Sequence, residues 1–179
     1  MSYLETRPYA PIRSGAAEPR ALEPDSATLT PREQEVLGLM AQGYLHKQIA
    51  RTLNITINTV EKHLCNIHEK FQTASSFQTV LVGITYGFLD LNTLMAPYDL
   101  ALADQLSPAE RRVLEAMVAD HGSGDTGQHI AWTLVLSEAT VDKHFGNIMR
   151  KLEVPGKMLA GLIYLAAKEQ GIVSEDMRR

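Results

Sequence analysis

Two stretches of this chain share one pattern of apolar and polar positions. In residues 58–71 the apolar side chains recur at i, i+4, i+7 and i+11, which places them on one face of an α-helix. Residues 139–152 repeat that spacing, and seven of the fourteen positions are identical in the two stretches. The two stripes are Val60, Leu64, Ile67 and Phe71, and Val141, Phe145, Ile148 and Leu152. The chain therefore contains an internal repeat centred on an amphipathic helix.

The same series of elements precedes each of these helices. Residues 30–33 read Thr-Pro-Arg-Glu, a capping box with proline at the first helical position, and residues 107–110 read Ser-Pro-Ala-Glu. A short helix follows in each copy and leads through a tight turn into the amphipathic helix, which Thr56 or Ser137 caps. Two short helices joined in this way form a helix-turn-helix, and we predict one near 46–71 and another near 128–152.

A fourth helix follows each copy, and the second of these carries two apolar stripes instead of one. Two stripes are more than one small core needs, which predicts a buried interface at Leu159, Leu162 and Ile163, either between subunits or between the copies. We favour a homodimer. Trp132 aligns with Arg51 and is also predicted to lie at an interface; the alternative is that the inserted loop within 121–127 or the proline-rich N-terminal segment covers it.

These patterns predict five segments. We expect a flexible proline-rich tail over 1–28, a first domain over 29–90 and an apolar linker over 91–105 that packs against the fold. A more divergent second domain spans 106–173, and a short tail spans 174–179. Aromatic residues make up only 6% of the chain, and Gly and Pro cluster between the periodic segments, which favours an all-α fold.

Composition narrows the class of protein. The net charge of −4 means that any contact with nucleic acid must come from a local patch. One cysteine allows no internal disulfide, and no apolar run reaches membrane-spanning length, so we predict a cytoplasmic protein without membrane contact. Phosphate-binding loops, catalytic triads and zinc-ligand spacings do not occur, which predicts no enzymatic activity, no metal and no cofactor.

Three groups of residues together resemble a known family. The first copy resembles the LuxR-type (GerE-like) DNA-binding domain of bacterial regulators. The resemblance rests on Leu29-Thr30-Pro31-Arg32-Glu33, then Ile49-Ala50 with Leu53, then Thr59-Val60 with His63, Asn66-Ile67 and Lys70. Residues 106–173 resemble a second copy. The resemblance implies an all-α fold of two tandem four-helix LuxR-type helix-turn-helix domains. In such a domain the third helix enters the major groove of double-stranded DNA, and the fourth often dimerises.

The residues expected to face DNA follow from the resemblance and from the outward faces of the helices. They are Lys47, Thr59, Glu61, Lys62, Cys65, Asn66 and Lys70 in the first copy, and Thr140, Lys143, Asn147, Arg150 and Lys151 in the second. Glu61 and Asp142 stand where the family often has Lys or Arg; Glu can accept a hydrogen bond from cytosine but repels phosphate. Because Gln128 and Trp132 replace Lys47 and Arg51, the first copy is predicted to be the principal DNA reader.

Three functional classes fit these patterns. The first is a transcription regulator that binds specific DNA sequences. The second is a protein-interaction module of the same fold that has lost DNA binding and modulates another regulator or RNA polymerase, which the acidic charge balance and Glu61 and Asp142 support. The third is a promoter reader similar to a sigma factor, which the absence of the remaining sigma-factor regions disfavours.

Overall fold

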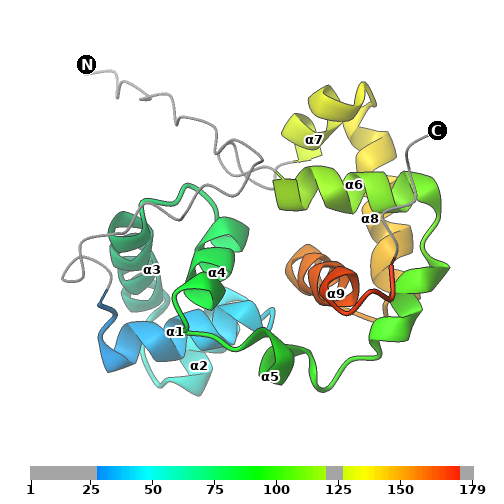
Figure 1. Cartoon of the computed structure of the whole chain (residues 1–179). Helices are drawn as coiled ribbons and strands as arrows, with labels where there is room; N and C mark the ends of the chain where they lie inside the picture. Colours follow the sequence, from blue (N-terminus) through cyan, green and yellow to red (C-terminus); the bar gives the residue numbers. More distant parts are fainter. Residues whose placement is uncertain (1–27, 120–126, 174–179) are drawn as a thin grey trace, which may run out of the picture.

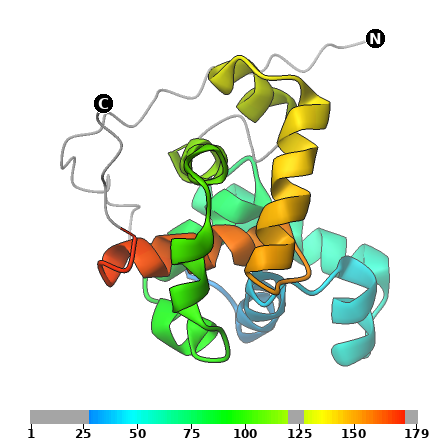
Figure 2. The ribbon, with the colours of Figure 1, turned by 90° about the vertical axis from the view of Figure 1, so that its right-hand side faces the viewer.

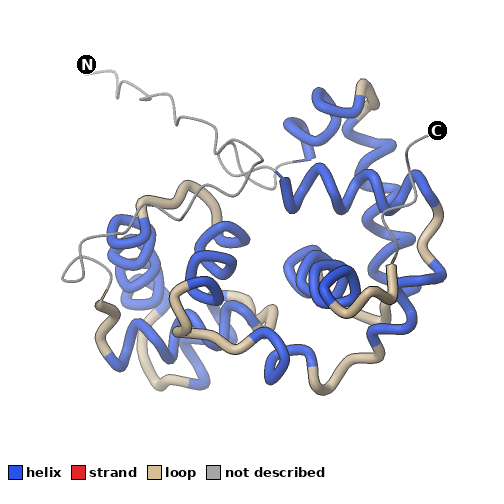
Figure 3. Tube along the Cα trace, viewed as in Figure 1, coloured by secondary structure: helices blue, strands red, loops and turns tan. Residues whose placement is uncertain are grey.

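The computed structural model describes residues 28–119 and 127–173. These residues form helices joined by loops, with no strand among them, as Figure 3 shows, so the predicted all-α fold is confirmed. The helices are α1 (Pro31–Ala41), α2 (His46–Thr52), α3 (Ile57–Phe71), α4 (Ser76–Thr85), α5 (Leu91–Met95), the 3₁₀ helix η1 (Leu100–Gln105), α6 (Pro108–Ala119), α7 (Gly127–Leu134), α8 (Glu138–Lys151) and α9 (Lys157–Glu169) (Figure 1).

Side-chain caps begin the helices at the residues that the sequence indicates. The Thr30 amide donates to the Glu33 carboxylate at 2.7 Å, and the Ser107 amide donates to the Glu110 carboxylate at 2.8 Å. The Thr56 hydroxyl accepts from the backbone amide at the third position of α3, and Ser137 accepts in the same way in α8. These bonds satisfy amides that have no partner inside the helix, so the starts of these four helices are encoded locally.

The two helix-turn-helix units use the same geometry. In each, the turn contains one residue with a left-handed backbone, Asn54 (φ 53°) in the first unit and Val135 (φ 56°) in the second. The predicted stripes of α3 and α8 are buried in both. The helices α2–α3 and α7–α8 therefore occupy the two stretches that the repeat predicted.

The linker between the copies is folded. Residues 91–105 form α5 and η1, begun by Asp90 and Asp99, whose carboxylates accept from backbone amides at 3.1 and 2.9 Å. Leu91 and Met95 are buried, and both α5 and η1 pack against α9. The linker is therefore part of the core, as its apolar residues predicted, although the sequence did not indicate helices there.

Helix α9 lies at the junction of the two copies (Figure 1). It packs against α6 and α8 of its own copy. A methyl group added at Gly161 would lie 2.2 Å from Met117 Cε and 2.7 Å from the Phe77 ring of α4. A methyl group added at Gly43 would lie 3.0 Å from Leu159 Cδ1. The copies therefore meet within one chain, in close contact around Gly43 and Gly161.

This arrangement bears on the predicted interface. Leu159, Leu162 and Ile163 are all buried inside the chain, and Leu159 lies against the first copy. Of the two placements that the sequence left open, the structure shows contact between the copies. Figure 2 shows the same packing from the side, with α9 running behind α8. A homodimer therefore stays a prediction, and it would have to use another surface, because these residues are already covered.

Several predicted features lie outside the described residues. They are most of the N-terminal tail (1–27), most of the inserted loop (120–126) and the C-terminal tail (174–179).

Candidate nucleic-acid interface

The outward face of α3 is held in place by its buried stripe. Val60 and Ile67 are fully buried, so Lys62 and Cys65, on the opposite side, are exposed, and Asn66 is half-buried. The predicted residue Thr59 belongs to the cap, because its hydroxyl lies 2.8 Å from that of Thr56.

The N-terminus of α2 lies beside α3. His46 Nδ1 is 3.9 Å from a carboxylate oxygen of Glu61, and Lys47 is the next residue along. Lys47 and Glu61 are both exposed. Among the described residues, neither Lys47 nor Lys62 forms an ion pair. The two exposed lysines are therefore not held by a carboxylate of the described residues.

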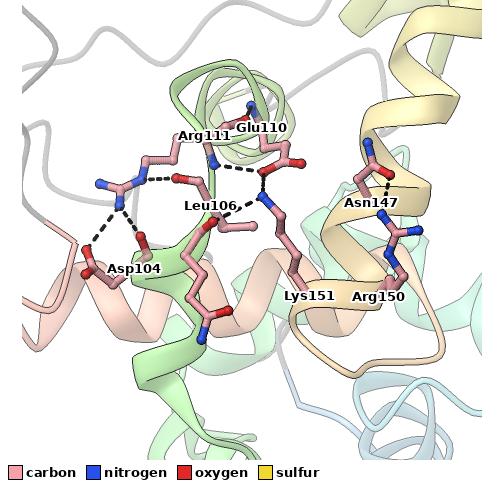
Figure 4. Close-up of polar contacts among 9 residues, drawn as sticks. Asp104, Leu106, Glu110, Arg111, Asn147, Arg150 and Lys151 are labelled. Atoms are coloured by element: carbon pink, nitrogen blue, oxygen red, sulfur yellow. Dashed lines mark hydrogen bonds and ion pairs between the residues drawn. The ribbon is translucent and has the colours of Figure 1, made fainter.

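The matching face of α8 is more occupied by contacts within the chain. Lys157 Nζ lies 3.2 Å from the Asp142 carboxylate and 4.5 Å from the centre of the Phe145 ring. The Arg150 guanidinium donates to the Asn147 side-chain oxygen at 2.9 Å (Figure 4). The Thr140 hydroxyl lies 2.8 Å from Ser137 and belongs to the cap. Of the residues predicted to face DNA here, Lys143 is exposed and makes no ion pair with the described residues.

Lys70 and Lys151, which were also predicted to face DNA, make ion pairs inside the fold. Lys70 Nζ lies 2.7 Å from the Glu33 carboxylate and donates to the Thr28 carbonyl at 3.0 Å. Lys151 makes the same pair with Glu110 at 2.7 Å and donates to the Gln105 carbonyl at 3.1 Å (Figure 4). Each lysine therefore ties the end of the third helix to the start of the first helix and to the chain before it.

The two carboxylates have lowered pKa values. Burial raises the pKa of Glu33, but hydrogen bonds from Lys70 and from the Thr30 amide and hydroxyl outweigh it, so the net pKa lies below the ordinary range. Burial likewise raises the pKa of Glu110, but hydrogen bonds from Lys151 and from the Ser107 amide outweigh it, so the net pKa is lowered. The sequence signal for these pairs was present, because Glu and Lys recur at equivalent positions in both copies, but only the fold shows that they meet.

His68 is the one residue of α3 whose polar atom is buried without a hydrogen-bond partner among the described residues. Burial and repulsion from His46 both hold its pKa below the ordinary value. Met149 occupies the equivalent position of α8. The fold therefore disfavours the charged form of His68, at a site that an apolar side chain fills in the second copy.

We expect His68→Met to raise the free energy of unfolding by about 1 kcal/mol. The substitution removes a buried nitrogen that has no hydrogen-bond partner among the described residues, so no hydrogen bond is lost. As the pH falls below about 6.5, the unfolded chain binds a proton at His68 before the folded chain does. The wild-type chain therefore loses stability there, and the gain from the substitution should be larger at pH 5.5 than at pH 8. Urea unfolding of both chains at the two pH values measures it; an equal difference at both would contradict the prediction.

The second helix-turn-helix has an exposed apolar surface at a place where the first copy carries a more polar one. Trp132 is 78% exposed and Val135 is 91% exposed, and Leu136 beside them is also exposed. We call these three residues the Trp132 patch. The aligned residues of the first copy are Arg51, Asn54 and Ile55. The patch was predicted as an interface at Trp132 alone, and among the described residues nothing covers it.

Local charge differs little between the copies. Helices α2 and α3 carry four Lys or Arg and two acidic residues, and α7 and α8 carry three and two. Within the described residues, His, Cys, Asp and Glu side chains do not gather into a group that could hold a metal ion. The described helices are also too short or too polar to span a membrane.

Comparison with known proteins identifies the family. The family model described as bacterial regulatory proteins, luxR family, matches residues 27–82 and again residues 104–163, which together are more than half of the chain. The chain belongs to the luxR family. Both matches include the helix-turn-helix units described above, so the tandem organisation is supported by two independent segments. No solved structure gave a significant match.

Three curated relatives of this luxR-family chain are regulators. The tetrathionate response regulatory protein TtrR of Salmonella typhimurium is 43% identical over 47 residues, which cover 26% of this chain and 23% of TtrR. The probable transcriptional regulator ycf29 of Cyanophora paradoxa is 47% identical over 51 residues (28% and 24%). The response regulator protein VraR of Staphylococcus aureus is 38% identical over 61 residues (34% and 29%). This chain thus spans about a quarter of the length of these relatives.

Proposed function

We propose that this protein is a DNA-binding transcription regulator whose first copy reads double-stranded DNA through α3 in the major groove. The observation that carries the proposal is the outward face of α3, where Lys62 and Cys65 are exposed and Asn66 is accessible beside them. Asn and Lys are suited to the donor and acceptor pattern of base edges. Lys47, which is exposed at the start of α2, would bind a phosphate and so position the helix without reading sequence.

The second copy is proposed to contribute less to DNA binding. Its Asp142 and Asn147 are engaged by Lys157 and Arg150, and Gln128 replaces Lys47. Lys70 and Lys151 are not proposed as main contacts, because a phosphate would have to compete with Glu33 and Glu110. The proposal includes no enzymatic activity.

A second candidate function is favoured by the Trp132 patch. Exposed tryptophan is enriched at protein interfaces, and the patch places Trp132 and Val135 where the first copy carries Arg51 and Asn54. The second copy would then serve as a protein-interaction module that contacts another regulator or RNA polymerase. If the chain fails to bind any duplex at low salt, this function alone remains.

The test compares Lys62→Ala with Lys143→Ala, which remove equivalent exposed lysines from α3 and α8. The duplex is selected by the wild-type chain from a randomised pool. We expect Lys62→Ala to weaken binding by about 1–3 kcal/mol and to relax sequence preference at one position, because a base contact is lost. Lys143→Ala should have a smaller effect.

Arg112→Ala is the control, since it removes an exposed cation of α6 outside both helix-turn-helix units. Affinities are measured by mobility shift or anisotropy at several salt concentrations, because phosphate contacts change the salt dependence. Equal losses from Lys62→Ala and Lys143→Ala would mean that both copies read DNA. A larger loss from Lys143→Ala would reverse the assignment of the principal reader.

A further inference from the structure

The Trp132 patch is unusual in its backbone as well as in its exposure. Val135 has a left-handed φ of 56°, a conformation in which β-branched side chains are genuine outliers. Asn54, at the same place in the first copy, is a residue that adopts this conformation readily. The valine therefore strains the turn, and because it is 91% exposed, its side chain gains no burial in return among the described residues. Strain of this kind points to a role for the side chain.

We propose that residues 7–13 of the same chain dock on the Trp132 patch. These residues read Arg-Pro-Tyr-Ala-Pro-Ile-Arg and contain a Pro-x-x-Pro sequence. Such sequences favour an extended polyproline helix, which packs its rings against exposed aromatic side chains with little loss of conformational entropy. The patch offers the only tryptophan of the chain, flanked by the exposed apolar side chains of Val135 and Leu136.

Charge complementarity supports this occupant. Arg7 and Arg13 flank the Pro-x-x-Pro sequence, which contains no acidic residue. The exposed acidic residue Glu138 begins α8 two positions after Leu136. The same cations would have no acidic partner at the matching place in the first copy, where Ile57 begins α3. The segment is therefore matched to the second copy.

The chain is long enough to make this contact. Fourteen residues lie between Arg13 and Thr28, the first described residue, and the fifteen extended steps from one to the other reach about 50 Å. A compact chain of this length has a radius of gyration of about 16 Å, so this reach exceeds its diameter. Because the segment is tethered, its effective concentration at the patch is high, and a weak contact is sufficient.

Docking would make the second helix-turn-helix a covered surface. This inference does not depend on DNA binding by the first copy, and its test uses no DNA.

The test uses the fluorescence of Trp132 in the full chain, since no other tryptophan contributes. We expect Pro8→Gly/Pro11→Gly and Arg7→Glu/Arg13→Glu each to shift the emission to longer wavelength and to reduce protection from acrylamide quenching. Both pairs change residues outside 28–173, so the packing of the described helices should be retained. Pro19→Gly/Pro24→Gly is the matched control, which changes two prolines of the same segment outside residues 7–13 and should leave quenching unchanged.

A third variant tests the patch itself. Val135→Asn installs the residue that the first copy carries, so it relieves the strained turn while removing the apolar contact. On its own, Val135→Asn should raise the acrylamide quenching of Trp132. In the Pro8→Gly/Pro11→Gly chain it should cause no further rise, because the docked contact is already lost there. The proposal is overturned if Trp132 in the proline and arginine variants is quenched as in the wild-type chain, or if the control pair has the same effect as Pro8→Gly/Pro11→Gly. It is also overturned if the protection of Trp132 changes with chain concentration, because the occupant would then be a second copy of the chain.

Discussion

Glu33→Ala is expected to lower the free energy of unfolding by about 2–4 kcal/mol, because it leaves Lys70 without its buried partner. The Glu33 side chain is 4% exposed and that of Lys70 is 31% exposed, so the pair lies partly within reach of solvent. The substitution also removes the two hydrogen bonds from the Thr30 amide and hydroxyl that begin α1. Chemical denaturation measures the loss.

The second copy supplies a matched substitution. Glu110→Ala should cost a similar amount, because Lys151 makes the same pair at the same distance. Lys70→Met in the Glu33→Ala chain should recover part of the loss, since the unpaired charge is removed as well. A loss below about 1 kcal/mol for both alanine variants would mean that the pairs behave as ordinary surface ion pairs.

The two Glu–Lys pairs make the stability of the folded chain depend on pH. The pKa values of Glu33 and Glu110 are lowered in the folded chain, so their contribution to stability is fully present above the ordinary Glu pKa of about 4.3. It is lost as the pH falls further through the folded pKa, because the carboxylates then take up protons and release the lysines. Glu33→Gln should therefore destabilise the chain at pH 7 and have a smaller effect below pH 4.

Gly161→Val is the second large effect, expected to destabilise the chain by about 1–3 kcal/mol through overpacking between the copies. A Cβ at this position would lie 2.2 Å from Met117 Cε and 2.7 and 2.9 Å from the Phe77 ring. The Met117 methyl can move away easily, but the buried ring of Phe77 cannot, so the contact of α9 with α4 must open. We expect the single unfolding transition to broaden or divide into two as the copies separate.

Gly38→Ala is the control for this substitution. Gly38 lies inside α1, and an added methyl group would meet nothing within 4 Å. Alanine there should raise stability by about 0.5–1 kcal/mol, because it favours the helix and disturbs no contact. If Gly161→Val were as neutral or stabilising as Gly38→Ala, the close contact between the copies would not exist in solution.

Features that depend on neighbouring residues could be predicted from the amino-acid sequence. Thr30 and Glu33, like Ser107 and Glu110, begin helices through bonds three residues apart. The 3.6-residue period placed the stripes of α3 and α8 in the core, and it placed Lys62 and Lys143 on the opposite, exposed faces. These interactions are local, so the fold class and the two helix-turn-helix units could be predicted.

Contacts between residues far apart in the chain could not be predicted from sequence spacing and are known only from the folded structure. Lys70 and Lys151 were predicted to face DNA, but they meet carboxylates 37 and 41 residues away, and no spacing rule brings such residues together. The double stripe of α9 indicated an interface, but whether it lies between subunits or between the copies depends on how α5 and η1 turn the chain back. The sequence predicted that Trp132 is exposed on its short helix, but whether another element covers it depends on packing, and none of the described elements does.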